Sequence, residues 1–244
     1  MDESYLQRKH MHEAQPTVIC IHGAGGGGWE FALWQPIWAD AGYCVVAHDL
    51  APAADGLAET RFDDYLQQVL DWVPAQGPNI LVGASLGGML ALKAAEIISP
   101  AALVVVNSVP PAGIGAPRPA KTYPAIIPWA NGPLHETRDA LFDSDEATIQ
   151  WAWPRWRDES GAVLSALAAG IAVNRPACPT LVVLGQRDTD IAPPTGLALA
   201  AWAGADVHLY AGMSHVGPLL SRRAGEVARM VLAWCDARLH AMQL

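Results

Sequence analysis

The segment Gly83–Gly87, with the sequence Gly-Ala-Ser-Leu-Gly, most limits what this chain can fold into. It follows the apolar run Ile80–Val82 and precedes a stretch of helical composition from about Gly88 to Ile98. Glycines on both sides of a serine allow a tight turn in which a strand and the next helix pack closely. Such a turn raises the Ser85 hydroxyl above the sheet edge, which predicts a nucleophile. The Leu86 amide then lies at a helix start, where negative charge is stabilised.

Short apolar runs alternate with longer helical stretches along most of the chain. Six runs are strand candidates: Thr17–Ile21, Cys44–His48, Asn79–Val82, Leu103–Asn107, Thr180–Leu184 and Val207–Tyr210. Nearly continuous apolar runs are typical of strands that are buried on both faces. Between two of them, apolar residues recur at helical spacing from Phe62 to Val73, with Thr60 as the expected N-cap. The pattern predicts an α/β fold with a mostly parallel sheet of about six strands and helices on both faces.

Two residues that could assist Ser85 follow later in the chain. Asp188 comes shortly after the fifth of these apolar runs, and His215 comes shortly after the sixth. A serine hydroxyl is a weak nucleophile at neutral pH, so an imidazole must accept its proton and a carboxylate must orient that imidazole. We therefore expect Ser85, Asp188 and His215 to form a catalytic triad. The alternative acid is Asp190. The alternative base is His208, but it lies inside an apolar run, where a histidine is more often a core residue.

A further motif follows the first apolar run. The segment His22–Gly28 reads His-Gly-Ala-Gly-Gly-Gly-Gly and resembles the oxyanion loop of the α/β-hydrolase superfamily. The chain order serine, aspartate, histidine is also the order of that superfamily. From about residue 15 to the C-terminus, the chain resembles the small esterase or lipase-like branch of these enzymes.

The resemblance implies roles for individual residues. In this family the triad acid lies three residues after the glycine that ends its strand, which fits Asp188 after Gly185 better than the alternative acid. The histidine at the start of the oxyanion loop, here His22, braces that loop. The backbone amides of Ala24 and Leu86 are expected to bind the oxyanion, and each such donor contributes about 3 kcal/mol of transition-state stabilisation.

Residues 110–175 interrupt the alternation of strands and helices. The segment is rich in proline and glycine at first and becomes helix-like from Thr137 onward. It stands where this family inserts a cap or lid, and a connection of this length is typical of a functional element. The candidates for the wall of a substrate pocket are Trp29, Trp151, Trp153 and Trp156. Packing of the cap onto the sheet is an equally good interpretation of these tryptophans.

Composition sets further limits. The chain has 244 residues, of which 52% are hydrophobic and 16% charged, so one large domain over residues 1–244 is expected. Its formal net charge of −9 argues against a nucleic-acid partner. No membrane span is evident, and the acidic start Met1–Ser4 does not resemble a secretory signal. The four cysteines show no CxxC or other metal spacing and are expected to be reduced thiols, so we expect a cytoplasmic protein. His10 and His12 have no third ligand nearby, so no metal site is expected.

These observations favour an enzyme that cleaves a carboxylic ester of a small apolar molecule, without metal or organic cofactor. Fold and triad alone do not fix the reaction. The alternatives on the same framework are lactone, thioester or C–C bond hydrolysis, cofactor-free haloperoxidase chemistry and hydroxynitrile lyase chemistry. A ligand-sensing receptor is the alternative from another class. The oligomeric state stays open.

Overall fold

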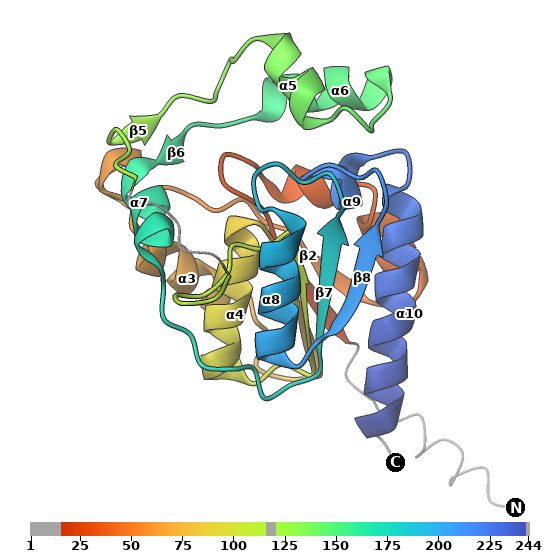
Figure 1. Ribbon diagram of the computed structural model, residues 1–244. Helices are drawn as coiled ribbons and strands as arrows, with labels where there is room; N and C mark the ends of the chain where they lie inside the picture. The colour runs from red at the N-terminus through yellow and green to blue at the C-terminus, as the bar shows by residue number, and fades with distance from the viewer. Residues whose placement is uncertain (1–15, 116–120, 243–244) are drawn as a thin grey trace, which may run out of the picture.

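The computed structural model describes residues 16–115 and 121–242 (Figure 1). The expectations for Met1–Ser4, His10 and His12 concern positions outside these ranges.

Six parallel strands form the central sheet, as the sequence predicts. They are β1 (Thr17–Ile21), β2 (Cys44–Val46), β3 (Asn79–Ala84), β4 (Ala102–Val106), β7 (Thr180–Gly185) and β8 (Asp206–Tyr210), in the order β2-β1-β3-β4-β7-β8. β2 is shorter than expected, whereas β3 runs two residues further because Ala84 still pairs with Val106. The ladder therefore continues to the residue before Ser85.

Alternate residues of the strands enter two separate apolar cores. In β1, Val18 and Cys20 belong to one core and Ile19 and Ile21 to the other. One face is covered by α3 (Phe62–Asp71), α4 (Leu86–Ile98) and α8 (Pro193–Ala203), and the opposite face by α2 (Gln35–Asp40) and α10 (Ala224–Met242). This three-layer arrangement, with α3, α4 and α8 together and α10 apart from them, can be followed in Figure 1.

The start of α3 differs by one residue from the expectation. The Arg61 amide donates a hydrogen bond to Asp64 Oδ2 over 2.7 Å, so Arg61, and not Thr60, occupies the N-cap position. The Thr60 hydroxyl instead donates to the Gly56 carbonyl and accepts from the Ala53 amide, both over 3.0 Å. The expected cap was wrong because the threonine is used within the preceding turn.

The segment between β4 and β7, residues 107–179, will be called the β4–β7 connection. It contains β5 (Ile126–Ile127), α5 (Leu134–Ala140), α6 (Glu146–Ala152), η3 (Trp153–Arg155), β6 (Glu159–Ser160) and α7 (Gly161–Ala169). β5 and β6 pair with each other in antiparallel fashion. α5 and α6 lie beyond the carboxyl ends of the central strands (Figure 1). Elsewhere in the described ranges lie η1 (Gly28–Phe31), η2 (Leu57–Glu59) and α9 (Gly217–Leu220).

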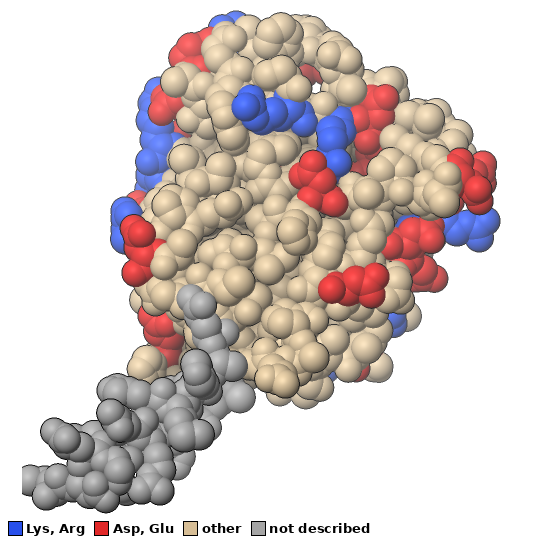
Figure 2. All heavy atoms as spheres, turned by 180° about the vertical axis from the view of Figure 1, so that it is seen from behind, with Lys and Arg blue, Asp and Glu red and all other residues tan. Residues whose placement is uncertain are grey.

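Charged side chains are scattered over the face shown in Figure 2. Lysine and arginine lie among aspartate and glutamate there, around a broad uncharged area. Within the two described ranges, every helix is too short or too polar to cross a lipid bilayer.

Candidate active site

Ser85 is the single residue between the end of β3 and the start of α4. Its φ of 53° and ψ of −116° are rare for a residue with a side chain, and such backbone conformations cost roughly 1–3 kcal/mol. Three hydrogen bonds hold the turn: the Ser85 amide donates to the Val106 carbonyl, and the Ser85 carbonyl accepts from the Gly88 and Val109 amides. A conformation so unfavourable and so well supported is typical of a functional site.

Close backbone contacts explain why glycine occupies positions 83 and 87. A Cβ atom on Gly83 would lie 2.1 Å from the Gly87 carbonyl oxygen, and one on Gly87 would lie 2.1 Å from the Ile21 carbonyl oxygen. The first turn of α4 therefore contacts the backbone of the sheet directly. This contact places Ser85 beside the loop that follows β1, where the Gly23 Cβ position is 3.4 Å from Ser85 Cβ.

His215 and Asp188 are joined by a hydrogen bond. His215 Nδ1 lies 2.8 Å from Asp188 Oδ2, and the Asp188 side chain is fully buried. The other carboxylate oxygen, Asp188 Oδ1, accepts hydrogen bonds from the amides of Asp190 and Ile191 over 2.8 and 2.9 Å. Because a carboxylate accepts at Nδ1, the proton of a neutral His215 ring lies on Nδ1, and Nε2 is available as a base.

Asp190 approaches the opposite side of the same ring. Its Oδ2 lies 3.9 Å from His215 Nε2, and its side chain is largely exposed. Burial alone would lower the pKa of His215. The hydrogen bond and charge of Asp188, together with the charges of Asp190 and Glu30, outweigh burial and raise the pKa above its usual value.

His208, the alternative base, was expected to be a core residue, and this expectation was wrong. It lies on β8, which is an edge strand, and its side chain is exposed. The ring packs against Tyr210, with 4.5 Å between the ring centres.

A cavity of about 470 Å³ lies over the carboxyl edge of the sheet. Ser85, His215 and Ala24 line its floor, and the β4–β7 connection contributes Trp129 and Trp156 to its walls. Such volumes are typical of sites for small organic ligands. The structure therefore brings Ser85 and the His215–Asp188 pair to one cavity with aromatic walls.

The four tryptophans named from the sequence lie in different places. Trp156 lines the cavity, whereas the other three are not among its lining residues. Trp29 packs edge-to-face on Trp151 and Trp156, with ring centres 5.6 and 4.9 Å apart. The exposed Trp153 donates its indole N–H to the Gly132 carbonyl over 2.6 Å.

The loop after β1 holds the Ala24 amide in a defined orientation. The carbonyl of the Gly23–Ala24 peptide lies 2.7 Å from His22 Nδ1 and accepts a hydrogen bond from the Gly26 amide over 3.2 Å. Since the C=O and N–H of a trans peptide point in opposite directions, these contacts also orient the Ala24 N–H. Within the described part of the chain, neither this amide nor that of Leu86 donates a hydrogen bond, so both remain available as donors.

His22 is a neutral ring in this arrangement. Its Nε2 accepts a hydrogen bond from the Leu50 amide over 2.9 Å, so the ring proton lies on Nδ1 and is donated to the Gly23 carbonyl. Burial lowers the pKa of His22 to about 4, helped by the nearby charge of Arg157.

Sequence reasoning missed Glu30, which also lines the cavity. It is buried, and its Oε2 accepts a hydrogen bond from the Gly23 amide over 3.2 Å. Burial raises the pKa of Glu30 to about 7, although the Gly23 hydrogen bond and the charges of His215 and Arg157 act in the opposite direction. A charged residue between Trp29 and Phe31 was the signal that could have singled it out.

Among the residues that the structure describes, four carboxyl groups and no lysine or arginine line the cavity. The four are Glu30, Glu136, Asp139 and Asp190. Within the described ranges, no lysine or arginine forms an ion pair with any of them. No three His, Cys, Asp or Glu side chains of residues 16–115 and 121–242 are grouped so that they could hold a metal ion.

The parallel sheet, the strand–turn–helix at Ser85 and the pairing of His215 with Asp188 agree with the resemblance of the sequence to α/β-hydrolases. The sequence model of the alpha/beta hydrolase family matches residues 18–230, and the chain belongs to this family.

Among known proteins, tobacco (Nicotiana tabacum) salicylic acid-binding protein 2 is 36% identical over 86 residues, which are 32% of this chain and about a third (33%) of that protein's length. The structure of tomato methylketone synthase I with 2-tridecanone superposes with a TM-score of 0.73 at 16% identity, over 92% of this chain and 99% of that one. A pyrethroid hydrolase from Sphingobium faniae gives 0.71 at 21% identity, over 91% and 98%. Both structures share the fold.

Proposed function

We propose that this protein is a serine hydrolase that cleaves a carboxylic ester of a small, largely apolar molecule through an acyl-enzyme. The observation that carries the proposal is the 2.8 Å contact between His215 and the buried Asp188, in a cavity that Ser85 also lines. An oriented imidazole that lines the same cavity as a serine in a strained turn supports activation of that hydroxyl for acyl transfer.

In the first half of the proposed reaction, Ser85 Oγ attacks the ester carbonyl carbon while His215 Nε2 takes the hydroxyl proton. The carbonyl oxygen becomes an oxyanion, which accepts hydrogen bonds from the Ala24 and Leu86 amides. The tetrahedral intermediate then breaks its bond to the alcohol oxygen, and His215 returns the proton to this leaving group. Asp188 holds the ring and stabilises its charged form throughout.

The second half releases the acid. His215 takes a proton from a water molecule as the water oxygen attacks the acyl carbonyl, and the same two amides stabilise the second oxyanion. The bond to Ser85 Oγ breaks, the serine regains its proton from His215, and the carboxylic acid leaves.

The β4–β7 connection would act as the cap of this single-domain enzyme. Its Trp129 and Trp156 face the cavity, which supports an apolar or aromatic group on the substrate. Other acyl bonds, such as those of lactones or thioesters, would pass through the same steps.

Ligand binding without turnover is the second candidate. The names of the similar proteins include a hydrolase, a synthase and a binding protein. An intact His215–Asp188 pair favours turnover, because pure binding does not need an oriented base. Continuous release of p-nitrophenol from a p-nitrophenyl ester supports the hydrolase, whereas a single slow turnover with retained product supports the binding protein.

The decisive experiment combines that assay with Ser85→Ala. The variant should remain folded and lose about a million-fold in kcat, because the serine and histidine act as one unit. A fluorophosphonate should label the wild-type protein on the peptide that contains Ser85. Full activity in Ser85→Ala, or label on another residue, would contradict the assignment of the nucleophile.

A further inference from the structure

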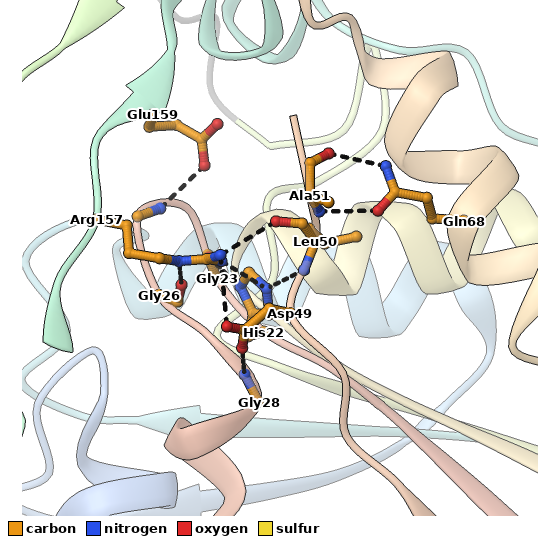
Figure 3. Close-up of polar contacts among 11 residues, drawn as sticks. His22, Gly23, Gly26, Gly28, Asp49, Leu50, Ala51, Gln68, Arg157 and Glu159 are labelled. Atoms are coloured by element: carbon orange, nitrogen blue, oxygen red, sulfur yellow. Dashed lines mark hydrogen bonds and ion pairs between the residues drawn. The ribbon is translucent and has the colours of Figure 1, made fainter. Parts of the chain in front are cut away.

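Two charged residues of the β4–β7 connection bind the loop that would form the oxyanion hole. Arg157 lies just before β6 and Glu159 begins it, and both face the segment Gly23–Gly28 (Figure 3). Their side-chain contacts with that loop join residues 134 and 131 positions apart in sequence. The triad mechanism assigns no role to either residue.

Gly25 is held from both sides of its backbone. The Arg157 amide donates to the Gly25 carbonyl over 2.7 Å, and the Gly25 amide donates to Glu159 Oε2 over 2.9 Å. The next carbonyl, that of Gly26, accepts from Arg157 Nε over 2.6 Å. Gly25 itself has a φ of +66°, and a Cβ atom there would lie 2.5 Å from Trp129. The loop thus has a conformation that favours glycine and is fixed by the connection.

These contacts act on the peptide group next to Ala24. The amide that Glu159 binds belongs to the Ala24–Gly25 peptide, and the preceding Gly23–Ala24 peptide is held by His22 and Gly26. Because each peptide group is planar, fixing both planes fixes the direction of the Ala24 N–H.

Arg157 also supports His22 from the other side of its ring. One guanidinium nitrogen lies 3.2 Å from His22 Nε2, and another donates to the Leu50 carbonyl over 3.2 Å. A cation at Nε2 disfavours protonation there, so His22 stays neutral and keeps its Nδ1 proton for the Gly23 carbonyl. The same guanidinium lies 3.6 Å from Asp49, whose other oxygen accepts from the Gly28 amide.

Glu159 is itself rigidly placed. Its carboxylate is buried, and Oε1 accepts from the Tyr65 hydroxyl over 2.9 Å and from the Ser160 amide over 2.7 Å. A buried carboxylate with three donors is a fixed acceptor and not a mobile surface charge.

We propose that Arg157 and Glu159 are positioning residues that hold the Ala24 amide in the orientation that binds the oxyanion. The β4–β7 connection would then contribute to the rate of the reaction as well as to the cavity wall. The proposal rests on the proposed ester hydrolysis, and it predicts a loss confined to the transition state.

The first test is a kinetic comparison of Glu159 and Arg157 variants. Glu159→Gln keeps one acceptor for the Gly25 amide but loses the charge, so its kcat should fall about tenfold. The kcat of Glu159→Ala should fall about 10²-fold, which is the loss expected for one oxyanion donor. The kcat of Arg157→Lys should also fall about tenfold. KM should change less than threefold, because the oxyanion exists only in the transition state.

A transition-state analogue separates positioning from general damage. An aryl trifluoromethyl ketone adds to Ser85 Oγ, the serine proton passes to His215, and the hemiketal oxyanion occupies the hole. Its inhibition constant should rise by the same factor as kcat/KM falls, while that of the product carboxylate stays constant. The matched control is the exposed Arg138–Glu146 ion pair, because Arg138→Gln and Glu146→Gln alter the same connection away from the loop.

Amide hydrogen exchange provides a readout that does not depend on activity. Peptides covering Gly23–Gly28 should exchange faster in Glu159→Gln than in the wild type, and not in Glu146→Gln. Unchanged exchange, or unchanged kcat and analogue affinity in folded Glu159 and Arg157 variants, would overturn the proposal. A wild-type protein without Ser85-dependent esterase activity would refute the proposed function, and with it the catalytic role, even if exchange shows the contact to be present.

Discussion

Two aspartates that are two positions apart contact the two nitrogens of one histidine. Asp188 is buried and hydrogen-bonded to Nδ1, while the exposed Asp190 lies 3.9 Å from Nε2. At the scale of single residues, the first contact fixes the tautomer and orientation of His215, and the second changes only the charge near the reacting nitrogen. The two carboxylates should therefore have separable effects.

Asp188→Asn is expected to lower kcat by about ten-thousand-fold, because an amide favours the wrong tautomer of His215. Asp190→Asn should keep most of kcat. Since Asp190 helps to raise the pKa of His215, its removal should move the acid limb of the profile of kcat/KM against pH to lower pH. Profiles of the two variants measured side by side check this. An unmoved acid limb in Asp190→Asn would show that this charge does not reach the ring.

Glu30 should make the stability of the protein depend on pH. Burial raises its pKa to about 7, so between pH 4.5 and 7 the folded protein binds a proton that the unfolded chain has lost. The free energy of unfolding contributed by this group therefore falls as pH rises through that window. Glu30→Gln keeps an acceptor for the Gly23 amide and cannot ionise. Its melting temperature relative to wild type should rise from pH 5 to pH 8, and a constant difference would contradict the raised pKa.

At the scale of secondary-structure elements, the site depends on how closely α4 approaches the sheet. The helix begins one residue after Ser85, and Gly87 lies against the Ile21 carbonyl at the end of β1. This approach brings the Leu86 amide next to the loop that starts at His22. The position of the Leu86 amide relative to that loop therefore follows from one backbone contact, whereas the Ala24 amide is oriented by contacts within the loop and with the β4–β7 connection.

Gly87→Ala should be strongly destabilising. Its Cβ would lie 2.1 Å from a backbone oxygen that cannot move without breaking the ladder, and forced overpacking costs about 1–3 kcal/mol or more. Gly225→Ala in α10 is the matched control, since the nearest atoms there are side-chain atoms at 3.6 Å. It should be neutral or slightly stabilising. Urea denaturation of both variants measures the difference. Equal stability would mean that α4 can shift away from β1 at little cost.

Local patterns predicted the strands and the Ser85 turn, because each is encoded by residues that are neighbours in the sequence. The chain order also predicted Asp188 and His215, which lie at the ends of adjacent strands β7 and β8; their catalytic roles stay predictions. By contrast, the exposure of His208 depends on β8 being an edge strand, which the pairing order decides. The contacts of Arg157 with Gly26 join residues 131 positions apart, and no local pattern marks them.

At the scale of the whole molecule, the net charge of the chain and the charge of the cavity wall are both negative. The chain has a formal net charge of −9, and three exposed carboxylates, Glu136, Asp139 and Asp190, line the cavity. In the described part of the chain, no arginine or lysine lines it. The field in such a cleft repels anions and is screened by salt. The substrate should therefore be neutral or cationic near the reacting carbonyl.

This field can be tested with two esters of similar length, p-nitrophenyl valerate and the negatively charged p-nitrophenyl hemisuccinate. Each carboxylate at about 8 Å in water costs an anion about 0.5 kcal/mol, so three of them should lower kcat/KM for the hemisuccinate about tenfold. The difference in kcat/KM between the two esters should become smaller in 0.5 M salt. Asp139→Asn or Glu136→Gln should reduce this difference at low salt. Glu146→Gln, which changes a residue of α6 outside the cavity, should leave it unchanged. Equal rates for the two esters at low salt would mean that solvent screens the cavity wall completely and that its charge does not select the substrate.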